Sequence, residues 1–227
     1  MAGPVVGPAM LLCDMTDSSI DVFDRFAPEY DQWFDAHQFA YQSELAAIRR
    51  LIPSQGSGIE IGAGTGRFCV PLNLALAVEP SLRMAAIARS RGAQVVQSES
   101  EHLPFPEQAF DFAVMINVLC FLADPLTVLR EARRILRPHG HIVVAIIDKT
   151  SPLGAGYEAH KQTSRFYQHA RFYSTAEVTE LLKQGGFEVC YYCQTIFSAP
   201  EAMSKPDPVL DGHGTGAFVV ISASKVG

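Results

Sequence analysis

Apolar and polar residues follow one another along the chain in a way that predicts strands separated by helices. Apolar runs suited to strands end at Ile61 or cover residues 74–79, 93–97, 110–116 and 141–147. The run over 110–116 is almost continuously apolar, which is typical of a parallel strand buried on both faces. Because segments of helical period connect these runs, the sequence predicts an α/β fold with a doubly wound, mostly parallel sheet.

Capping residues mark the helices that follow these strands. Ser81, Asp124 and Ser174 are good helix N-caps, and Ser174 is followed three residues later by a glutamate, as in a capping box. Three helices are predicted in this way, over residues 81–91, 125–136 and 174–184. Two more strands are predicted after the last helix, over 187–196 and 217–224.

The segment over 20–54 has helical period and precedes the first strand. The period breaks near Pro28 and again at His37, so two or three short helices are predicted. Aromatic residues recur there at offsets of three and four, which places the following on one helical face: Tyr30, Trp33, Phe34, His37 and Tyr41. This face either packs against the core or forms a lid over a pocket. Residues 1–19 are rich in proline and glycine, and we expect a disordered tail there.

A glycine-rich loop follows the first strand. Gly62, Gly64 and Gly66 have no Cβ, so the backbone can adopt positive φ and a ligand can approach the main chain. The loop is predicted to enter a short helix over 67–70, which Pro71 ends. A dinucleotide-binding loop has its third glycine one position later than this one. A nicotinamide-dependent oxidoreductase is therefore the less favoured interpretation.

Two acidic residues accompany the glycine loop. Glu60 lies two residues before the first glycine, and Glu79 ends the second apolar run. An acid at the end of the second strand of such a fold typically binds the ribose hydroxyls of a nucleoside. The loop and the two acids together predict a nucleoside-binding site.

The pattern E-x-G-x-G-x-G resembles the first motif of class I S-adenosylmethionine-dependent methyltransferases. Further resemblance to the ubiquinone-biosynthesis-like (type 11) family is carried, in order, by Glu99-Ser100, 103–105, Phe110-Asp111 and 137–140. The match covers residues 56–147. It implies a Rossmann-like, seven-stranded sheet with one antiparallel strand. It also implies an enzyme that binds S-adenosyl-L-methionine at the carboxyl ends of the first strands, transfers its methyl group and releases S-adenosyl-L-homocysteine.

The resemblance also implies which residues hold the cofactor. Glu60 would help to bind the amino end of the methionine tail, Glu79 the ribose, and Glu99 with Ser100 the adenine. The family more often has Gly-Asp-Ala at 98–100. The complete implied set is Tyr30, Glu60, Gly62, Ala63, Gly64, Gly66, Glu79, Pro80, Met84, Glu99, Ser100, Asn117 and Val118. A noncatalytic, regulatory adenosylmethionine-binding protein would keep the same residues.

The methyl acceptor is predicted to be a small molecule. Arg165 and Arg171 are each followed by Phe-Tyr, and an arginine fork with neighbouring aromatic rings suits an anionic or aromatic acceptor. Surface ion pairs are the alternative role of these arginines. The complete set of candidate acceptor-binding residues is Trp33, His37, Tyr41, Arg165 and Arg171. A general base is needed only where the acceptor must lose a proton, and the candidates by type are His37, His160 and His169.

The expected organisation is a single methyltransferase domain over 20–227. Its parts are lid helices (20–54), a cofactor-binding core (56–147), an acceptor-side insertion (148–173) and a C-terminal helix with a strand pair (174–227).

The composition of the chain limits the kinds of partner that the protein is expected to bind. The chain has 227 residues, a formal charge of −6 and a pI near 5.6, so no basic field gathers nucleic acid or anionic lipid. Apolar runs of 18 residues and a basic leader are both lacking, and a cytoplasmic protein is expected. The five cysteines are expected to be reduced. Cys190 and Cys193 point to opposite faces of a predicted strand, so no metal site is predicted.

Overall fold

An eight-stranded sheet lies at the centre of the protein in a computed structural model that describes residues 19–227. Its strand order is β3-β2-β1-β4-β5-β8-β6-β7. The strands are β1 (Gly58–Ile61), β2 (Leu76–Val78), β3 (Val95–Val96), β4 (Phe110–Ile116), β5 (Leu136–Ile147), β6 (Phe187–Thr195), β7 (Leu210–Asp211) and β8 (Phe218–Lys225). The tail predicted over 1–19 lies outside the described residues, apart from Ser19, which begins the first helix.

The direction of the strands confirms a mostly parallel sheet with an antiparallel insertion. Strands β3, β2, β1, β4 and β5 pair in parallel, and β8 runs antiparallel between β5 and β6. The prediction of seven strands is wrong, because β7 pairs with Cys193 and Gln194 of β6 as an eighth strand. Two residues in a proline-rich loop are too few to show a strand period in the sequence.

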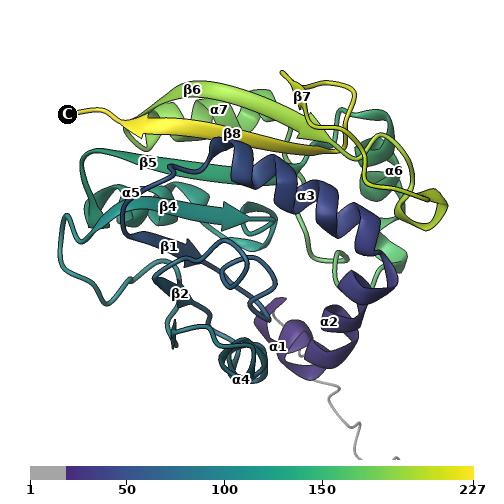
Figure 1. The fold of residues 1–227 in the computed structure, drawn as a ribbon, viewed down its shortest axis with the longest axis horizontal. Helices are drawn as coiled ribbons and strands as arrows, with labels where there is room; N and C mark the ends of the chain where they lie inside the picture. The colour runs from purple at the N-terminus through teal and green to yellow at the C-terminus, as the bar shows by residue number, and fades with distance from the viewer. Residues whose placement is uncertain (1–18) are drawn as a thin grey trace, which may run out of the picture.

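Helices cover both faces of this sheet. In Figure 1, α3 crosses the front of the sheet, and α5 and α7 lie behind it. The α-helices are α1 (Ser19–Arg25), α2 (Ala27–Ala36), α3 (Gln38–Leu51), α4 (Leu82–Ser90), α5 (Pro125–Ile135), α6 (Pro152–His160) and α7 (Thr175–Gln184). Three short 3₁₀ helices cover Leu119–Phe121, Lys161–Thr163 and Pro200–Ala202.

The strand order reverses at β1, which has β2 on one side and β4 on the other. A crevice forms at such a switch point, outside the carboxyl ends of the strands, because the connecting helices leave to opposite faces. Helices α1 and α2 lie beyond this edge of the sheet in Figure 1. The N-terminal segment has three helices with breaks at Phe26 and His37, close to the breaks in the sequence pattern.

Alternate residues of β4 pack into two different cores. Ala113 and Met115 face the core under α5 and α7, whereas Phe112, Val114 and Ile116 face the core under α3. All five side chains are buried, which confirms the prediction of a strand covered on both faces.

The chain after the glycine loop differs from the predicted short helix. Residues 67–73 form one hydrogen-bonded turn that ends at Asn73, where φ is +54°. The Leu74 N–H donates to the Cys69 carbonyl and the Asn73 N–H to the Val70 carbonyl, which is the Schellman pattern of a helix end. Pro71 cannot extend the turn into a helix, because it has no N–H to donate.

Residues 137–140 also differ from the prediction of a simple turn. They belong to β5, whose register against β4 shifts between Phe110 and Phe112. His139 has a φ of +61° at this irregularity. A Cβ on Gly140 would lie 2.9 Å from the Arg137 carbonyl oxygen and 3.0 Å from that of Asp111, so only glycine fits.

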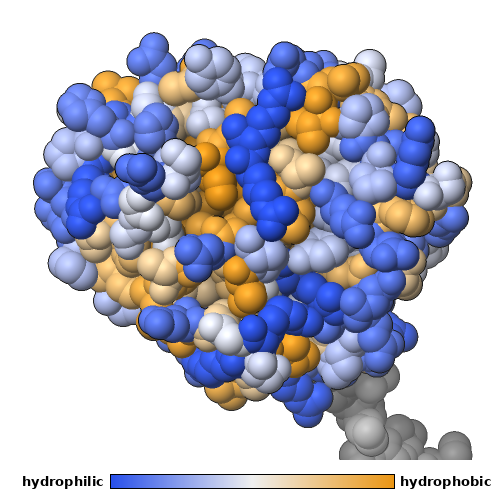
Figure 2. Space-filling view, in the orientation of Figure 1, coloured by the Kyte–Doolittle hydropathy of each residue, from blue (hydrophilic) through white to orange (hydrophobic). Residues whose placement is uncertain are grey.

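The predicted caps are present. The Asp124 carboxylate accepts from two backbone N–H groups, the Ser81 hydroxyl accepts from Met84, and Ser174 forms a capping box with Glu177. On the face shown in Figure 2, polar side chains interrupt the apolar areas. Within residues 19–227, every helix is too short or too polar to cross a membrane.

Candidate active site

A cavity of about 330 Å³ opens at the carboxyl ends of β1, β2 and β4. We call it the glycine-loop cavity, because Gly62 and Gly64 form part of its wall. Ten of the thirteen residues predicted for adenosylmethionine line it: Tyr30, Gly62, Gly64, Glu79, Pro80, Met84, Glu99, Ser100, Asn117 and Val118. They come from five separate segments of the chain, which the fold brings to one place.

Glu79 connects the end of β2 to the glycine loop. One carboxylate oxygen accepts from the Gly64 N–H at 2.8 Å, and the other accepts from the Ser81 N–H at 2.9 Å. Burial raises the pKa of Glu79, and the two N–H groups oppose that rise because they favour the ionised form. Each oxygen keeps a lone pair for a further donor, so Glu79 can also accept from two ligand hydroxyls.

The other three predicted residues, Glu60, Ala63 and Gly66, do not line the cavity. Burial raises the pKa of Glu60 to about 8, and its Oε2 atom has no partner within residues 19–227. A Cβ on Gly66 would lie 3.0 Å from the Ala88 side chain, so this glycine lets α4 pack closely.

A second cavity of about 170 Å³ adjoins the first. We call it the aromatic cavity, because nine aromatic side chains line it: Phe23, Tyr30, Trp33, Phe34, Phe121, Tyr157, Phe166, Tyr167 and Phe218. The lining also contains two carboxylates, Glu29 and Glu44, and no lysine, arginine or histidine of the described part of the chain.

The two cavities share part of their walls, namely Phe23, Tyr30, Asn117 and Phe121. Asn117 follows β4 with a φ of +54°. Its Oδ1 atom is buried and has no hydrogen-bond partner among residues 19–227. Because an unpaired buried acceptor is costly, this atom marks a position where a ligand donor would be stabilised.

Most residues predicted to bind the acceptor lie elsewhere. Trp33 lines the aromatic cavity, but His37 stacks on Trp33 outside it, and the Tyr41 hydroxyl donates to the Arg67 carbonyl. Arg165 and Arg171 are exposed, and their guanidinium groups lie over the rings of Phe26 and Tyr173.

The histidines predicted as general bases are also outside both cavities. His160 and His169 are exposed, and one ring nitrogen of His160 lies 2.9 Å from the Gly156 carbonyl oxygen. The ring of His37 lies 2.9 Å from the Trp33 carbonyl oxygen and 3.8 Å from Glu201. The structure therefore brings no described histidine to the acceptor side.

Sequence reasoning missed several of the residues that line the aromatic cavity. Phe166 and Tyr167, which directly follow Arg165, face the cavity in place of the arginine. Glu44 of α3 lines it as well, although α3 ends at Leu51, before the first strand and the glycine loop.

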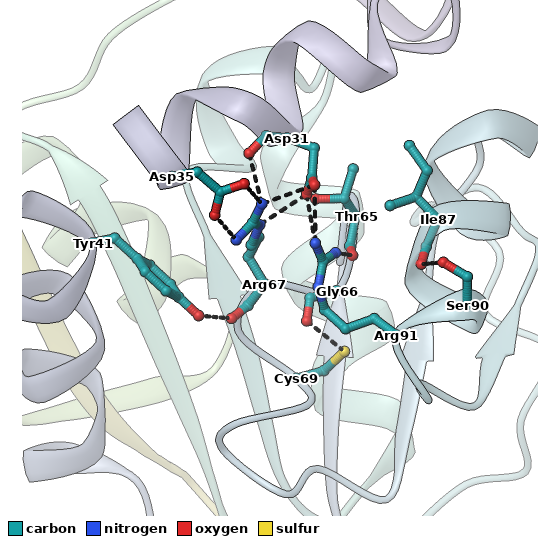
Figure 3. A network of polar contacts seen from close by, with 10 residues as sticks. All are labelled: Asp31, Asp35, Tyr41, Thr65, Gly66, Arg67, Cys69, Ile87, Ser90 and Arg91. Carbon is teal, nitrogen blue, oxygen red and sulfur yellow. Dashed lines mark hydrogen bonds and ion pairs between the residues drawn. The ribbon is translucent and has the colours of Figure 1, made fainter. Parts of the chain in front are cut away.

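An arginine–aspartate cluster, formed by Asp31, Asp35, Arg67 and Arg91, joins α2 to the glycine loop (Figure 3). Asp31 accepts from Arg67 at 2.8 Å and from Arg91 at 2.9 Å, and Asp35 accepts from Arg67 at 2.7 Å. Arg91 also donates to the carbonyl of Thr65 within the loop. Burial alone would raise the pKa of Asp31, but hydrogen bonds led by those from Arg67 lower it to about 2.

Comparison with known families matches residues 32–192 to the family described as Methyltransferase domain. An uncharacterised protein of Methanocaldococcus jannaschii is 45% identical over 91% of this chain and 100% of its own length. A demethylmenaquinone methyltransferase of Chlamydia trachomatis is 26% identical over 75% of this chain and 84% of its own.

Among solved structures, one neighbour gives the same class and another gives the same fold. A Thermotoga maritima protein described as a SAM-dependent methyltransferase, possible histamine N-methyltransferase, has 48% identity and a TM-score of 0.89, covering 91% of this chain and 99% of its own. The [4+2]-cyclase SpnF, at 17% identity, covers 92% of this chain and 97% of its own with a TM-score of 0.67, which shows a shared fold alone.

The chain belongs to the methyltransferase domain family and has the Rossmann-like fold of class I S-adenosylmethionine-dependent methyltransferases. Membership of this family implies that the chain binds S-adenosylmethionine. The glycine-loop cavity fits that ligand chemically, because it combines two glycines without side chains and a buried carboxylate for ribose hydroxyls.

Within residues 19–227, no group of three or more histidine, cysteine, aspartate or glutamate side chains could hold a metal ion. Cys190 is exposed and Cys193 is buried. The register of β6 against β8 shifts between Val189 and Tyr191, so the regular alternation expected for these two cysteines is interrupted at Cys190.

Proposed function

We propose that the protein transfers the methyl group of S-adenosylmethionine to a small molecule bound in the aromatic cavity. The observation that carries this proposal is the shared wall between the two cavities. Methyl transfer requires the nucleophile to lie in line with the donor bond, at about 3–3.5 Å. Ligands in two adjoining cavities can meet at such a distance, with Asn117 beside both.

The protein's own part is to bind and orient. Glu79 accepts from the ribose hydroxyls, Gly62 and Gly64 leave room for the methionine tail, and Ser100 with Glu99 borders the adenine. Bound S-adenosylmethionine supplies a sulfonium that already carries an activated methyl group. The aromatic rings of the second cavity exclude water and fix the acceptor, so no covalent intermediate on the protein is needed.

The names of relatives support a small acceptor without deciding its chemistry. The Thermotoga maritima protein is described as a possible histamine N-methyltransferase, and the Chlamydia trachomatis relative as a demethylmenaquinone methyltransferase. One name denotes an amine acceptor and the other a quinone. Neither acceptor is a macromolecule.

Two substitutions test the proposal from opposite sides. Glu79→Ala should weaken adenosylhomocysteine binding by about 1.5–3 kcal/mol, because hydrogen bonds to a carboxylate are lost. Tyr157→Leu changes only the aromatic cavity, so it should leave this affinity unchanged and lower methyl transfer to the acceptor. Calorimetry measures the first effect. Transfer of radiolabel from adenosylmethionine into a metabolite extract measures the second.

The outcomes separate the competing functions. Binding of adenosylhomocysteine without any labelled product would indicate a noncatalytic binding protein. A folded Glu79→Ala protein with unchanged affinity would show that the nucleoside binds elsewhere.

A further inference from the structure

Glu44 is a buried acid that the methyltransferase fold does not require. Its side chain lines the aromatic cavity, and the residue is only 8% exposed. Burial alone raises the pKa of its carboxyl group, and within residues 19–227 neither a hydrogen bond nor an opposite charge contributes to the shift, although buried carboxyl groups in proteins are normally paired. An unpaired acid that faces a cavity is stabilised when a ligand supplies the missing donor.

The surroundings of Glu44 select the charge of that ligand. The cavity lining contains aromatic faces, which carry negative potential, and two carboxylates, with no cationic side chain of the described part. An anion there would be repelled and left without a partner. A cation would gain both an ion pair and cation–π contacts, as in the aromatic cages that bind ammonium groups.

The unpaired Oδ1 atom of Asn117 adds a second acceptor to the same cavity. A ligand that satisfies Asn117 and Glu44 together must offer at least two hydrogen-bond donors. A primary ammonium group has three donors and no acceptor. A carboxylate, an ether or a thioether offers none.

We propose that the aromatic cavity binds a small primary or secondary amine as the methyl acceptor, and that Glu44 pairs with its ammonium group and then takes one proton from it. This inference rests on the proposed methyl transfer. It replaces the anionic acceptor expected from Arg165 and Arg171, because those side chains are exposed outside the cavity.

The proton and methyl transfers balance. An N–H bond of the ammonium breaks and Glu44 gains the proton, which leaves the nitrogen with a lone pair. The nitrogen forms its bond to the methyl group as the S–CH₃ bond of S-adenosylmethionine breaks, with the bonding electron pair remaining on sulfur. The products are an N-methylammonium ion, adenosylhomocysteine and a protonated Glu44, which then returns its proton to solvent.

Proton release gives a signature that does not depend on turnover. Burial raises the pKa of Glu44 to about 8, so most of this carboxyl group is protonated at pH 7 before a ligand binds. Before binding, the ammonium ion and protonated Glu44 together carry one proton more than the ion pair of ammonium and Glu44 carboxylate that forms in the cavity. Amine binding at pH 7 should therefore release protons, up to one for each amine bound.

Other titratable groups that face Glu44 do not produce this signal. Tyr30, Tyr157 and Tyr167 surround the cavity, and burial raises the pKa of each phenol further above neutrality. Glu29 also lines the cavity, but its residue is exposed, and the two substitutions used in the test leave it unchanged.

The experiment uses 2-phenylethylamine, together with other small primary amines and the carboxylates and alcohols of the same carbon skeletons. Each is titrated into the adenosylhomocysteine complex by calorimetry in buffers of different ionisation enthalpy, with Trp33 emission as a second signal. Glu44→Gln should weaken amine binding at least about tenfold and abolish proton release. Glu201→Gln is the control, because Glu201 is exposed and faces His37 outside the cavity.

The outcomes distinguish this inference from the proposed function. Amines bound in preference to carboxylates and alcohols, with proton release lost in Glu44→Gln alone, support it. Preference for the carboxylates or alcohols, no amine binding, or unchanged binding in Glu44→Gln would overturn it while adenosylhomocysteine still bound. Failure of adenosylhomocysteine to bind the wild-type protein would instead overturn the proposed function.

Discussion

Replacing Gly62 by alanine should abolish useful binding of adenosylhomocysteine, with Kd rising at least about 100-fold, or about 2.7 kcal/mol. A Cβ at this position would lie 2.5 Å from a methyl group of Val118, so one of the two must move. Both residues line the glycine-loop cavity, and movement of either changes the space for the ligand.

Backbone strain is separated from this effect by a matched substitution. Gly62 has a φ of +76° and Gly212 a φ of +79°, so alanine costs about 1–2 kcal/mol of stability at each. A Cβ on Gly212 meets nothing within 4 Å, and Gly212 lies in the turn between β7 and β8. Gly212→Ala should therefore lower the melting temperature and leave Kd unchanged. Wild-type affinity in a folded Gly62→Ala protein would contradict the proposed role of the loop.

Replacing Asp31 by alanine should destabilise the protein by about 2–4 kcal/mol, the scale for a paired charge that loses its partner in a largely buried site. The substitution leaves Arg67 and Arg91 close together without the carboxylate between them (Figure 3). Because these arginines belong to the glycine loop and to the end of α4, α2 should also separate from the loop. Chemical denaturation measures the stability, and hydrogen exchange measures the opening of α2.

Asp35→Ala is the control for this prediction. Asp35 also pairs with Arg67, but its side chain is 68% exposed and Asp31 remains bound to both arginines. Exposed ion pairs contribute about 0–1 kcal/mol, so the effect should be small. Equal losses of stability in the two variants would show that Asp31 is not the residue through which the arginine–aspartate cluster stabilises the protein.

The pH dependence of stability provides a separate test of Asp31. Its folded-state pKa of about 2 lies below the unfolded value of 3.8, so its contribution is complete above about pH 4 and is lost as the pH falls toward 2. Asp31→Asn should remove this part of the acid sensitivity. A wild-type slope between pH 4 and pH 2 in that variant would assign the effect to other carboxylates.

Many residues of the glycine-loop cavity could be predicted from the sequence, because they lie close to the ends of strands. Gly62, Gly64 and Glu79 each follow a strand at fixed spacing, so the order of the strands is enough to bring them together. Gly66 and Glu60 belong to the same motif but do not line the cavity. Spacing alone does not show which side of a loop a side chain faces.

The acceptor side could not be predicted in this way. Glu44 lies in a helix with other polar residues, and only the packing of α3 against β6 and β8 turns it inward. Arg165 and Phe166 are neighbours in sequence, yet the ring faces the cavity and the charge faces solvent. The two-residue strand β7 is likewise defined by its partner β6 and not by its own period.

The central claim is that the glycine-loop cavity binds S-adenosylmethionine next to the aromatic cavity. A crystal structure of the adenosylhomocysteine complex tests it most directly. The ribose hydroxyls should lie about 2.5–3.0 Å from the Glu79 carboxylate, with the adenine beside Ser100 and the sulfur near Asn117. A nucleoside bound in the aromatic cavity, or elsewhere with Glu79 free of contact, would contradict the claim.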